Sequence, residues 1–300
     1  MEVSGIDPRT RTSSEGRCHL VSELARLRAA GWTVPAGDST GVRRVGECAV
    51  SYPSEGLAAL GLDGGQGLWF DHRADQVAEV LRRRRVGAIW DVGAGAGSMC
   101  RRLAARGIEV VAVEPLPLGA KAIAAQGIEV FGGTLEQLTL PDGSLGAVGL
   151  FDVIEHVADS RPLLDEVHRV LAPGGVLVVT VPAFNWLWSD EDTVGGHHRR
   201  YRRGNLDADV GARGFVRRDT RYIFAALVPV AAVLRALPYR LGRRRSTTEM
   251  LSLVPNQLAP SPGVDRFARA VLATERWIAS LVPLPFGLSV LGVYERRADE

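Results

Sequence analysis

This chain of 300 residues has few lysines, few cysteines and a small net charge, and each of these features argues against a class of protein. Lys121 is the only lysine, so the other basic residues are arginines, and the formal net charge is only +2. A charge so close to zero gives no overall positive field, and we therefore expect no nucleic-acid partner. Cys18, Cys48 and Cys100 are odd in number and form no CxxC pair, which argues against a disulfide framework or a cysteine-based zinc site.

Long apolar runs are also missing. No run reaches the roughly 18 residues that a membrane-spanning helix needs, and the first 20 residues lack the apolar core of a secretory signal. These absences predict a cytoplasmic protein. The hydrophobic content of 46% suffices for one large domain, or for one domain with an added segment.

The middle of the chain alternates between short apolar runs and helical patterns. Strands are predicted at 86–92, 108–115, 128–133, 145–154 and 176–183, and helices at 76–85, 98–106, 118–126 and 161–171. Near-continuous apolar strands that alternate with helices predict a mostly parallel α/β sheet with helices on both faces. Such a sheet binds its ligand beyond the carboxyl ends of its strands.

Three glycines follow the first of these strands, where a ligand is expected. Gly93, Gly95 and Gly97 are spaced G-x-G-x-G, whereas a dinucleotide loop has G-x-G-x-x-G. Asp91, at the strand end, would repel a pyrophosphate but attract an ammonium or a sulfonium. Glu114, at the end of the second strand, can accept hydrogen bonds from both hydroxyls of a ribose. The predicted ligand is a positively charged nucleoside, a description that fits S-adenosylmethionine.

From about Trp69 to Tyr201 the chain resembles the class I S-adenosylmethionine-dependent methyltransferases. The similar stretches are "DVGAGAG", "VVAVEP", "GTLEQLTLPDGSLGAVGLFDVIEHV" and "VLAPGGVLVVTVPA", which occur in the order that the family has. The resemblance implies a Rossmann-like fold with a mostly parallel seven-stranded sheet, and S-adenosylmethionine as cofactor.

The resemblance also implies cofactor contacts after the third and fourth strands. Thr134 stands where many relatives carry an aspartate that meets the adenine amino group, and a threonine can still accept one hydrogen bond. Leu135 and Glu136 are implied to line the adenine, and Phe151 and Asp152 to face the cofactor.

Relatives often place an aromatic and arginine segment across the methionine end of the cofactor. The stretch "GLWFDHRADQ" precedes the first strand here. Trp69 and Phe70 are predicted to form a flat lid near the sulfonium, and Arg73 to pair with the cofactor carboxylate. The alternative is that Trp69 and Phe70 are ordinary packing residues.

Methyl transfer is an in-line displacement in which the sulfonium already supplies the activation, so the protein must align the acceptor and remove its proton. Candidate bases are Asp152, Glu155 and His156 in "FDVIEHV", and His197 and His198 in "GGHHRRYRR". His156 and His197 are the predicted catalytic residues, since the imidazole pKa suits this work. The alternatives are that His156 caps the following helix, or that no base is used. No acidic cluster with a metal-binding spacing stands out, which predicts metal-independent chemistry.

The stretch "GGHHRRYRRGNL" follows the fifth strand and resembles a GHxRRY segment of some relatives. His198, Arg200 and Tyr201 are predicted to bind an anionic group of the acceptor, such as a phosphate or carboxylate. The alternative is a solvated basic start of a helix.

The predicted organisation has four parts. Residues 1–50 are a flexible or loosely packed N-terminal extension, 51–222 the S-adenosylmethionine-binding α/β domain, 223–286 a helical insertion, and 287–300 the last strand with a C-terminal tail. The insertion opens at 223–245 with an apolar run that is interrupted by Pro229 and followed by arginines. It is predicted to contact the inner face of a membrane peripherally, or to cover an apolar acceptor. The alternatives are internal packing and a homodimer interface.

The function predicted from these features is methyl transfer to oxygen or nitrogen of a small-molecule or lipid-linked acceptor. Two alternatives remain. A nicotinamide-dependent oxidoreductase would have to hold a pyrophosphate beside Asp91 and would lack the Tyr-x-x-x-Lys pair, because Lys121 is the only lysine. A scaffold subunit that binds the cofactor without turnover would keep the same loop.

Overall fold

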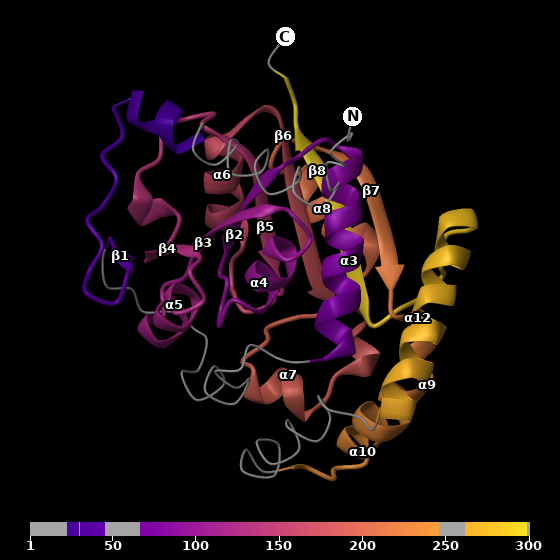
Figure 1. Cartoon of the computed structure of the whole chain (residues 1–300). Coiled ribbons are helices and arrows are strands. Elements are labelled where there is room, and N and C mark those ends of the chain that lie inside the picture. The colour runs from indigo at the N-terminus through magenta and orange to yellow at the C-terminus, as the bar shows by residue number, and fades with distance from the viewer. Residues whose placement is uncertain (1–22, 30, 46–66, 246–261, 299–300) are drawn as a thin grey trace, which may run out of the picture.

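A computed structural model describes the protein over residues 23–29, 31–45, 67–245 and 262–298. One sheet runs through these residues in the order β1-β4-β3-β2-β5-β6-β8-β7 (Figure 1). Its strands are β1 (Arg43–Arg44), β2 (Ala88–Val92), β3 (Glu109–Val113), β4 (Glu129–Gly132), β5 (Leu145–Phe151), β6 (Leu171–Pro182), β7 (Phe215–Ile223) and β8 (Ser289–Arg296). All neighbours are parallel except β8, which runs antiparallel between β6 and β7.

The α/β fold with a mostly parallel sheet is confirmed, but the expected count of seven strands is wrong by one. The extra strand is β1, whose two residues pair with the outer edge of β4. Sequence analysis does not predict it because two arginines carry no strand pattern, and only the pairing with the edge of β4 makes them a strand.

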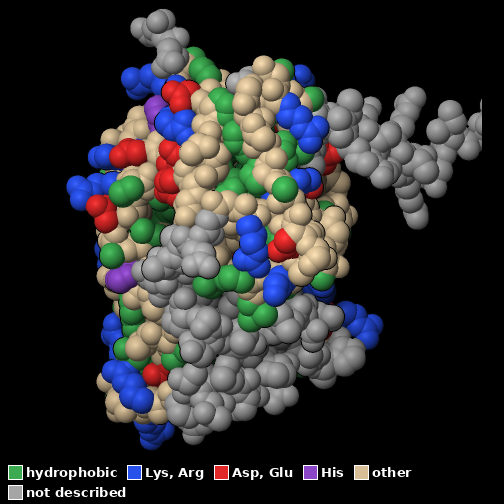
Figure 2. All heavy atoms as spheres, turned by 90° about the vertical axis from the view of Figure 1, so that its left-hand side faces the viewer, with side chains coloured by type: hydrophobic (Ala, Val, Ile, Leu, Met, Phe, Trp, Pro, Cys, Tyr) green, Lys and Arg blue, Asp and Glu red, His purple; other side chains and the backbone are tan. Residues whose placement is uncertain are grey.

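On the face in Figure 2, basic and acidic side chains lie interspersed on the described part of the surface.

Helices cover both faces of the sheet, as predicted. One layer consists of α3 (Leu68–Arg83), α4 (Ser98–Ala104) and α5 (Pro117–Ala124), which bury residues such as Leu81, Leu103 and Ile123. The other layer includes α6 (Arg161–Val170) and α8 (Arg203–Gly211), which bury Val167 and Val210. Helix α3 begins eight residues earlier than the predicted 76–85, so the aromatic and arginine segment lies on its first turns.

The predicted loose N-terminal extension is wrong for its described part, since residues 23–29 and 31–45 pack onto the sheet. Leu27, Trp32 and Val42 are buried. Trp32 donates its indole N–H to the carbonyl of Leu138 at 2.8 Å. The buried Glu23 accepts hydrogen bonds from the Trp90 indole at 3.2 Å and the Gly146 backbone at 2.9 Å. The remainder of 1–50 lies outside the described residues.

A helical insertion separates β7 from β8, as predicted. It contains η3 (Ala225–Leu227), α9 (Val228–Ala231), η4 (Ala232–Ala236), α10 (Leu237–Arg240) and α12 (Pro262–Leu281). Ion pairs join α12 to α3: Arg269 with Asp71 at 3.1 Å, and Arg276 with Asp75 at 3.5 Å. Within the described residues, none of the helices has both the length and the apolar character needed to span a membrane.

Replacement of Leu27 by alanine tests whether the N-terminal segment belongs to the core. Because the side chain is 1% exposed, Leu27→Ala should lower the free energy of unfolding by about 2–5 kcal/mol in urea denaturation. The neighbouring Arg28→Ala, an exposed position, should change it by less than about 0.5 kcal/mol. Equal, small effects of both changes would show that the segment is dispensable for stability.

Candidate active site

A cavity of about 620 Å³ lies at the carboxyl ends of β2, β3, β5 and β6. The loops after these strands line it, together with the start of α3 and residues 182–200. This is the edge where the parallel sheet was predicted to bind its ligand. The cavity has a glycine-loop end beside β2 and β3, and a histidine end beyond β5 and β6.

The glycine loop turns tightly because all three glycines have left-handed backbone angles, with φ of 75° at Gly93, 60° at Gly95 and 80° at Gly97. A Cβ on Gly93 would lie 2.9 Å from Val153, and one on Gly97 would lie 2.8 Å from Ile123. Gly93 and Gly95 line the cavity. Gly97 instead caps α4 and is not part of the lining. The loop therefore presents backbone, not side chains, to a ligand.

Asp91 is buried at the base of this end with an unsatisfied oxygen. One carboxylate oxygen accepts a hydrogen bond from the Cys100 thiol at 3.1 Å, and the other has no hydrogen-bond partner within the described part of the chain. Burial raises the pKa of Asp91 to about 7. A buried acceptor without a donor is costly, so this oxygen fits a ligand that brings an ammonium or a sulfonium.

Glu114 holds the loop from the end of β3. Its carboxylate oxygens accept hydrogen bonds from the backbone N–H of Gly95 at 2.7 Å and of Leu116 at 2.8 Å. Burial raises its pKa to about 7, although these two hydrogen bonds oppose the shift. Each oxygen keeps a second lone pair that can accept a hydroxyl, so the predicted ribose contact fits this geometry.

Trp69 and Arg73 reach the cavity from the first turns of α3. Trp69 stacks on Phe224 with ring centroids 3.8 Å apart, so one ring face packs against the insertion while the residue also lines the cavity. The buried guanidinium of Arg73 forms an ion pair with Asp152. The predicted partner of Arg73, a cofactor carboxylate, would have to share it with Asp152. Both interpretations of Trp69, lid and packing residue, agree with its position.

The chain turns sharply after β5. Asp152 has φ of 57°, a left-handed conformation that is unfavourable outside glycine and concentrates at functional sites. Its backbone N–H donates to the carbonyl of Thr180 at 2.8 Å, which ties the turn to β6. Phe151 and Asp152 line the cavity as predicted, and the turn directs the following residues to its histidine end.

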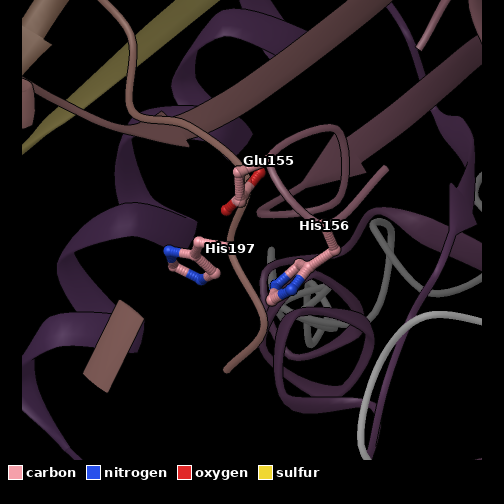
Figure 3. Close-up of side chains that lie close together, drawn as sticks. All are labelled: Glu155, His156 and His197. Carbon is pink, nitrogen blue, oxygen red and sulfur yellow. The ribbon is translucent and has the colours of Figure 1, made fainter. Parts of the chain in front are cut away.

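Glu155, His156 and His197 meet at that end (Figure 3). Their potential ligand atoms all lie within 4.8 Å of one another. Glu155 is fully buried, and neither carboxylate oxygen has a hydrogen-bond partner in the regions that the structure describes. Burial, with Asp152 as a second cause, raises the pKa of Glu155. Burial, with His197 as a second cause, lowers the pKa of His156 to about 4, so this imidazole is neutral near pH 7.

Asp192 is the residue that positions His197, and sequence analysis missed it. Its buried carboxylate accepts from His197 Nδ1 at 2.8 Å and from Arg200 at 2.7 and 2.8 Å. Burial would raise the pKa of Asp192, but these hydrogen bonds outweigh it and lower the value to about 2. Arg200 lines the cavity, and its guanidinium also binds Asp192 and the carbonyl of Ala183, so its role in binding the acceptor stays a prediction.

Four other predicted site residues lie outside the cavity lining. Tyr201 is 2% exposed and packs in the core, where its backbone continues the pairing beside β6, so the prediction that it binds the acceptor is wrong. His198 is exposed and also misses the cavity. Thr134 and Leu135 lie beyond the lining, and Leu135 is fully buried. Their predicted adenine contacts therefore have no support from this cavity.

The missed residues had weak local signals. Ser189 and Asp192 form a capping box at the start of α7 (Asp190–Val194), a pattern that the letters "SDED" could have revealed. Nothing in those letters indicates that Asp192 also binds His197. Ala231 and Arg235 line the cavity from the insertion, and Arg235 pairs with Glu191 at 2.9 Å.

Comparisons with known proteins agree with this arrangement. Residues 90–179 match the family described as "Methyltransferase domain". An uncharacterised methyltransferase of Mycobacterium tuberculosis is 41% identical over 91 residues, which cover 30% of this chain and 37% of that protein. A ubiquinone biosynthesis O-methyltransferase of Mesorhizobium japonicum is 28% identical over 179 residues, 58% of this chain and 65% of that protein. The chain thus spans less than two thirds of these relatives.

A solved structure shares the fold. The methyltransferase of Haloferax volcanii, in complex with the Trm112 methyltransferase activator, superposes with a TM-score of 0.52. The alignment covers 82% of this chain and 96% of that one, at 16% identity. At that identity the likeness establishes the fold alone, and the positions of the site residues come from this chain itself.

Replacement of Glu114 tests the ribose contact. Glu114→Gln keeps the shape but removes the charge, so S-adenosylhomocysteine should bind about ten- to a hundredfold more weakly in calorimetry, or about 1.5–3 kcal/mol. Because the pKa of Glu114 is raised to about 7 and the ligand needs the ionised form, wild-type affinity should increase from pH 6 to pH 8. The variant should lose the part of that increase that Glu114 contributes and keep the part that Asp91 contributes, because the pKa of Asp91 is also raised to about 7. Unchanged affinity in a folded variant would remove the assignment.

Proposed function

Because the chain belongs to the class I S-adenosylmethionine-dependent methyltransferase superfamily, we propose that it transfers a methyl group to an oxygen or nitrogen of an acceptor with an apolar portion. The observation that carries this proposal is one cavity with two chemically different ends. One end offers carboxylates to a cationic nucleoside, and the other offers a carboxyl and two imidazoles to an acceptor.

The glycine-loop end would hold the cofactor, which supplies an activated methyl group on its sulfonium. In the proposed arrangement Asp91 faces the cationic methionine end, Glu114 accepts the ribose hydroxyls, and Trp69 flanks the sulfonium. Gly93 and Gly95 allow the ligand to approach the backbone. The unsatisfied oxygen of Asp91 supports this assignment.

The histidine end would receive the acceptor. Methyl transfer to a hydroxyl or an ammonium requires loss of a proton, and we assign its handling to the cluster of Glu155, His156 and His197. Asp192 fixes the ring of His197 through Nδ1, so Nε2 is the nitrogen left for chemistry. The Mesorhizobium relative is an O-methyltransferase, and a relative from Parasynechococcus marenigrum, 37% identical over 105 residues, is a dimethylglycine N-methyltransferase, so the proposal covers both acceptor atoms.

An apolar portion of the acceptor is suggested by the insertion, which borders the cavity through Ala231 and Arg235. The same segment exposes large apolar side chains: Leu234 is 57% exposed, Leu241 67% and, on α12, Phe267 72%. Figure 1 shows these helices together on one side of the molecule. A surface so apolar beside a substrate cavity favours a lipid-linked acceptor and peripheral contact with a membrane.

The arginines of the insertion contribute less free positive charge to this surface than their number implies, because some of them form ion pairs. Arg235 pairs with Glu191, and Arg244 lies 4.0 Å from Asp190. We therefore expect the apolar side chains to provide most of the affinity for a membrane surface, with the basic residues adding a salt-sensitive part.

Ligand binding and transfer test the activity. S-adenosylhomocysteine should raise the melting temperature, whereas NAD should not, because a pyrophosphate beside the carboxylate of Asp91 is repelled. Incubation with isotopically labelled S-adenosylmethionine and a lipid extract should then yield a product heavier by one methyl group. Stabilisation by NAD alone would favour the oxidoreductase. Binding of S-adenosylhomocysteine without transfer to any polar or lipid extract would favour the scaffold subunit.

Vesicle sedimentation tests the membrane contact. Wild-type protein should pellet with vesicles containing phosphatidylglycerol, and replacement of Leu234, Leu237 and Leu241 by serine should reduce the pelleted fraction severalfold. Added salt should weaken binding only in part. Leu118→Ser is a matched control, because that leucine is 41% exposed on α5. If wild-type protein stays in the supernatant at low salt, or if the triple variant pellets equally, the insertion has another partner.

A further inference from the structure

We propose that Glu155, His156 and His197 bind a divalent first-row transition-metal ion at the acceptor end of the cavity. Binding of the ion does not depend on the proposed function. Only the role of the ion in catalysis rests on methyl transfer. A metal ion at this place differs from the metal-independent chemistry that the sequence predicted. Glu155 and His156 are adjacent, but His197 is remote in sequence and only the fold brings it to them (Figure 3).

The separation of the three groups suits a single ion. Zn²⁺ and similar ions lie about 2.0–2.2 Å from nitrogen and oxygen ligands, so two ligands of one tetrahedral ion are about 3.4 Å apart. The potential ligand atoms here lie within 4.8 Å of one another. Side-chain shifts of up to about 1.4 Å would therefore bring the widest pair to that spacing. One carboxylate and two imidazoles are a ligand set typical of zinc and its neighbours.

Glu155 supplies an independent indication of a ligand. Its side chain is fully buried, yet neither carboxylate oxygen has a hydrogen-bond partner among the described residues. A buried carboxylate without a donor is costly, and protein structures normally satisfy such a group. A cation between the carboxylate and the two histidines would supply the missing interaction.

The surroundings of His197 match those of a metal ligand. A ligating histidine usually donates its second ring N–H to a carboxylate or a carbonyl, which fixes the tautomer and the ring. His197 Nδ1 lies 2.8 Å from Asp192, and Asp192 is itself held by Arg200 and by the Ser189 backbone at 2.8 Å. This leaves Nε2 for the ion. Asp192 and Arg200 are thus positioning residues in the proposed site.

Three protein ligands leave an open coordination position, and the cavity leads to it. An acceptor hydroxyl on that position would lose its proton to solvent near neutral pH, because a bound cation stabilises the alkoxide. The oxygen would then attack the methyl carbon as the sulfur–carbon bond breaks, which yields the methyl ether and the neutral thioether. No oxidant or reductant is needed for this step.

Metal titration of the full chain tests the site directly. Tag-free protein is treated with a chelator, dialysed and titrated with Co²⁺, whose visible absorption reports coordination by nitrogen and oxygen. We expect saturation near one equivalent per chain and displacement of Co²⁺ by Zn²⁺. Glu155→Gln and His197→Gln should each weaken Co²⁺ binding at least a hundredfold.

His198→Gln is the matched control, because His198 adjoins His197 but is exposed and lies outside the cluster. It should bind Co²⁺ within about twofold of wild type. Circular dichroism melting of each variant verifies folding, and S-adenosylhomocysteine binding reports on the proposed function separately. Equal Co²⁺ binding by wild type and His197→Gln, or none by wild type, would overturn the metal site and leave His197 as a base held by Asp192. Metal binding without S-adenosylhomocysteine binding would instead refute the proposed function alone.

Discussion

Parallel pairing of β4, β3, β2, β5 and β6 is the constraint from which the site follows. Strands that run the same way end at one edge of the sheet, so residues far apart in the sequence meet there. Asp91 and Glu114 end neighbouring strands and reach one end of the cavity. Asp152 ends β5 and turns the chain toward the other end. The cavity is the space between these loops.

A buried carboxylate organises the histidine end. Asp192 starts α7 through its capping box with Ser189, and it also binds His197 and Arg200. Its low pKa of about 2 shows that hydrogen bonding outweighs burial, so the group stays ionised at neutral pH. Removal of one partner would leave a buried charge uncompensated, a change that typically costs several kcal/mol. Two residues of the segment predicted to bind the acceptor, His197 and Arg200, thus belong to an internal network that fixes one imidazole.

The insertion joins the cavity to the outer surface. Phe224 stacks on Trp69, and Ala231 and Arg235 line the cavity, while the next turns expose leucines and valines. One segment therefore shapes the acceptor end and carries a strongly apolar part of the described surface. This coupling is consistent with an acceptor whose reactive group enters the cavity while its apolar part remains outside.

The sequence by itself determined the α/β class, the strands β2 to β6 and β8, and the place of the cavity beside the glycine loop. It could do so because those features depend on local patterns: apolar runs, glycine spacing, and an acid at a strand end. Tertiary structure alone decided the rest. The burial of Leu27 and Trp32, the engagement of Arg200 by Asp192, the burial of Tyr201, and the meeting of His197 with Glu155 and His156 all involve partners distant in sequence. Such contacts arise from the packing of loops at the sheet edge, which no single stretch of sequence encodes.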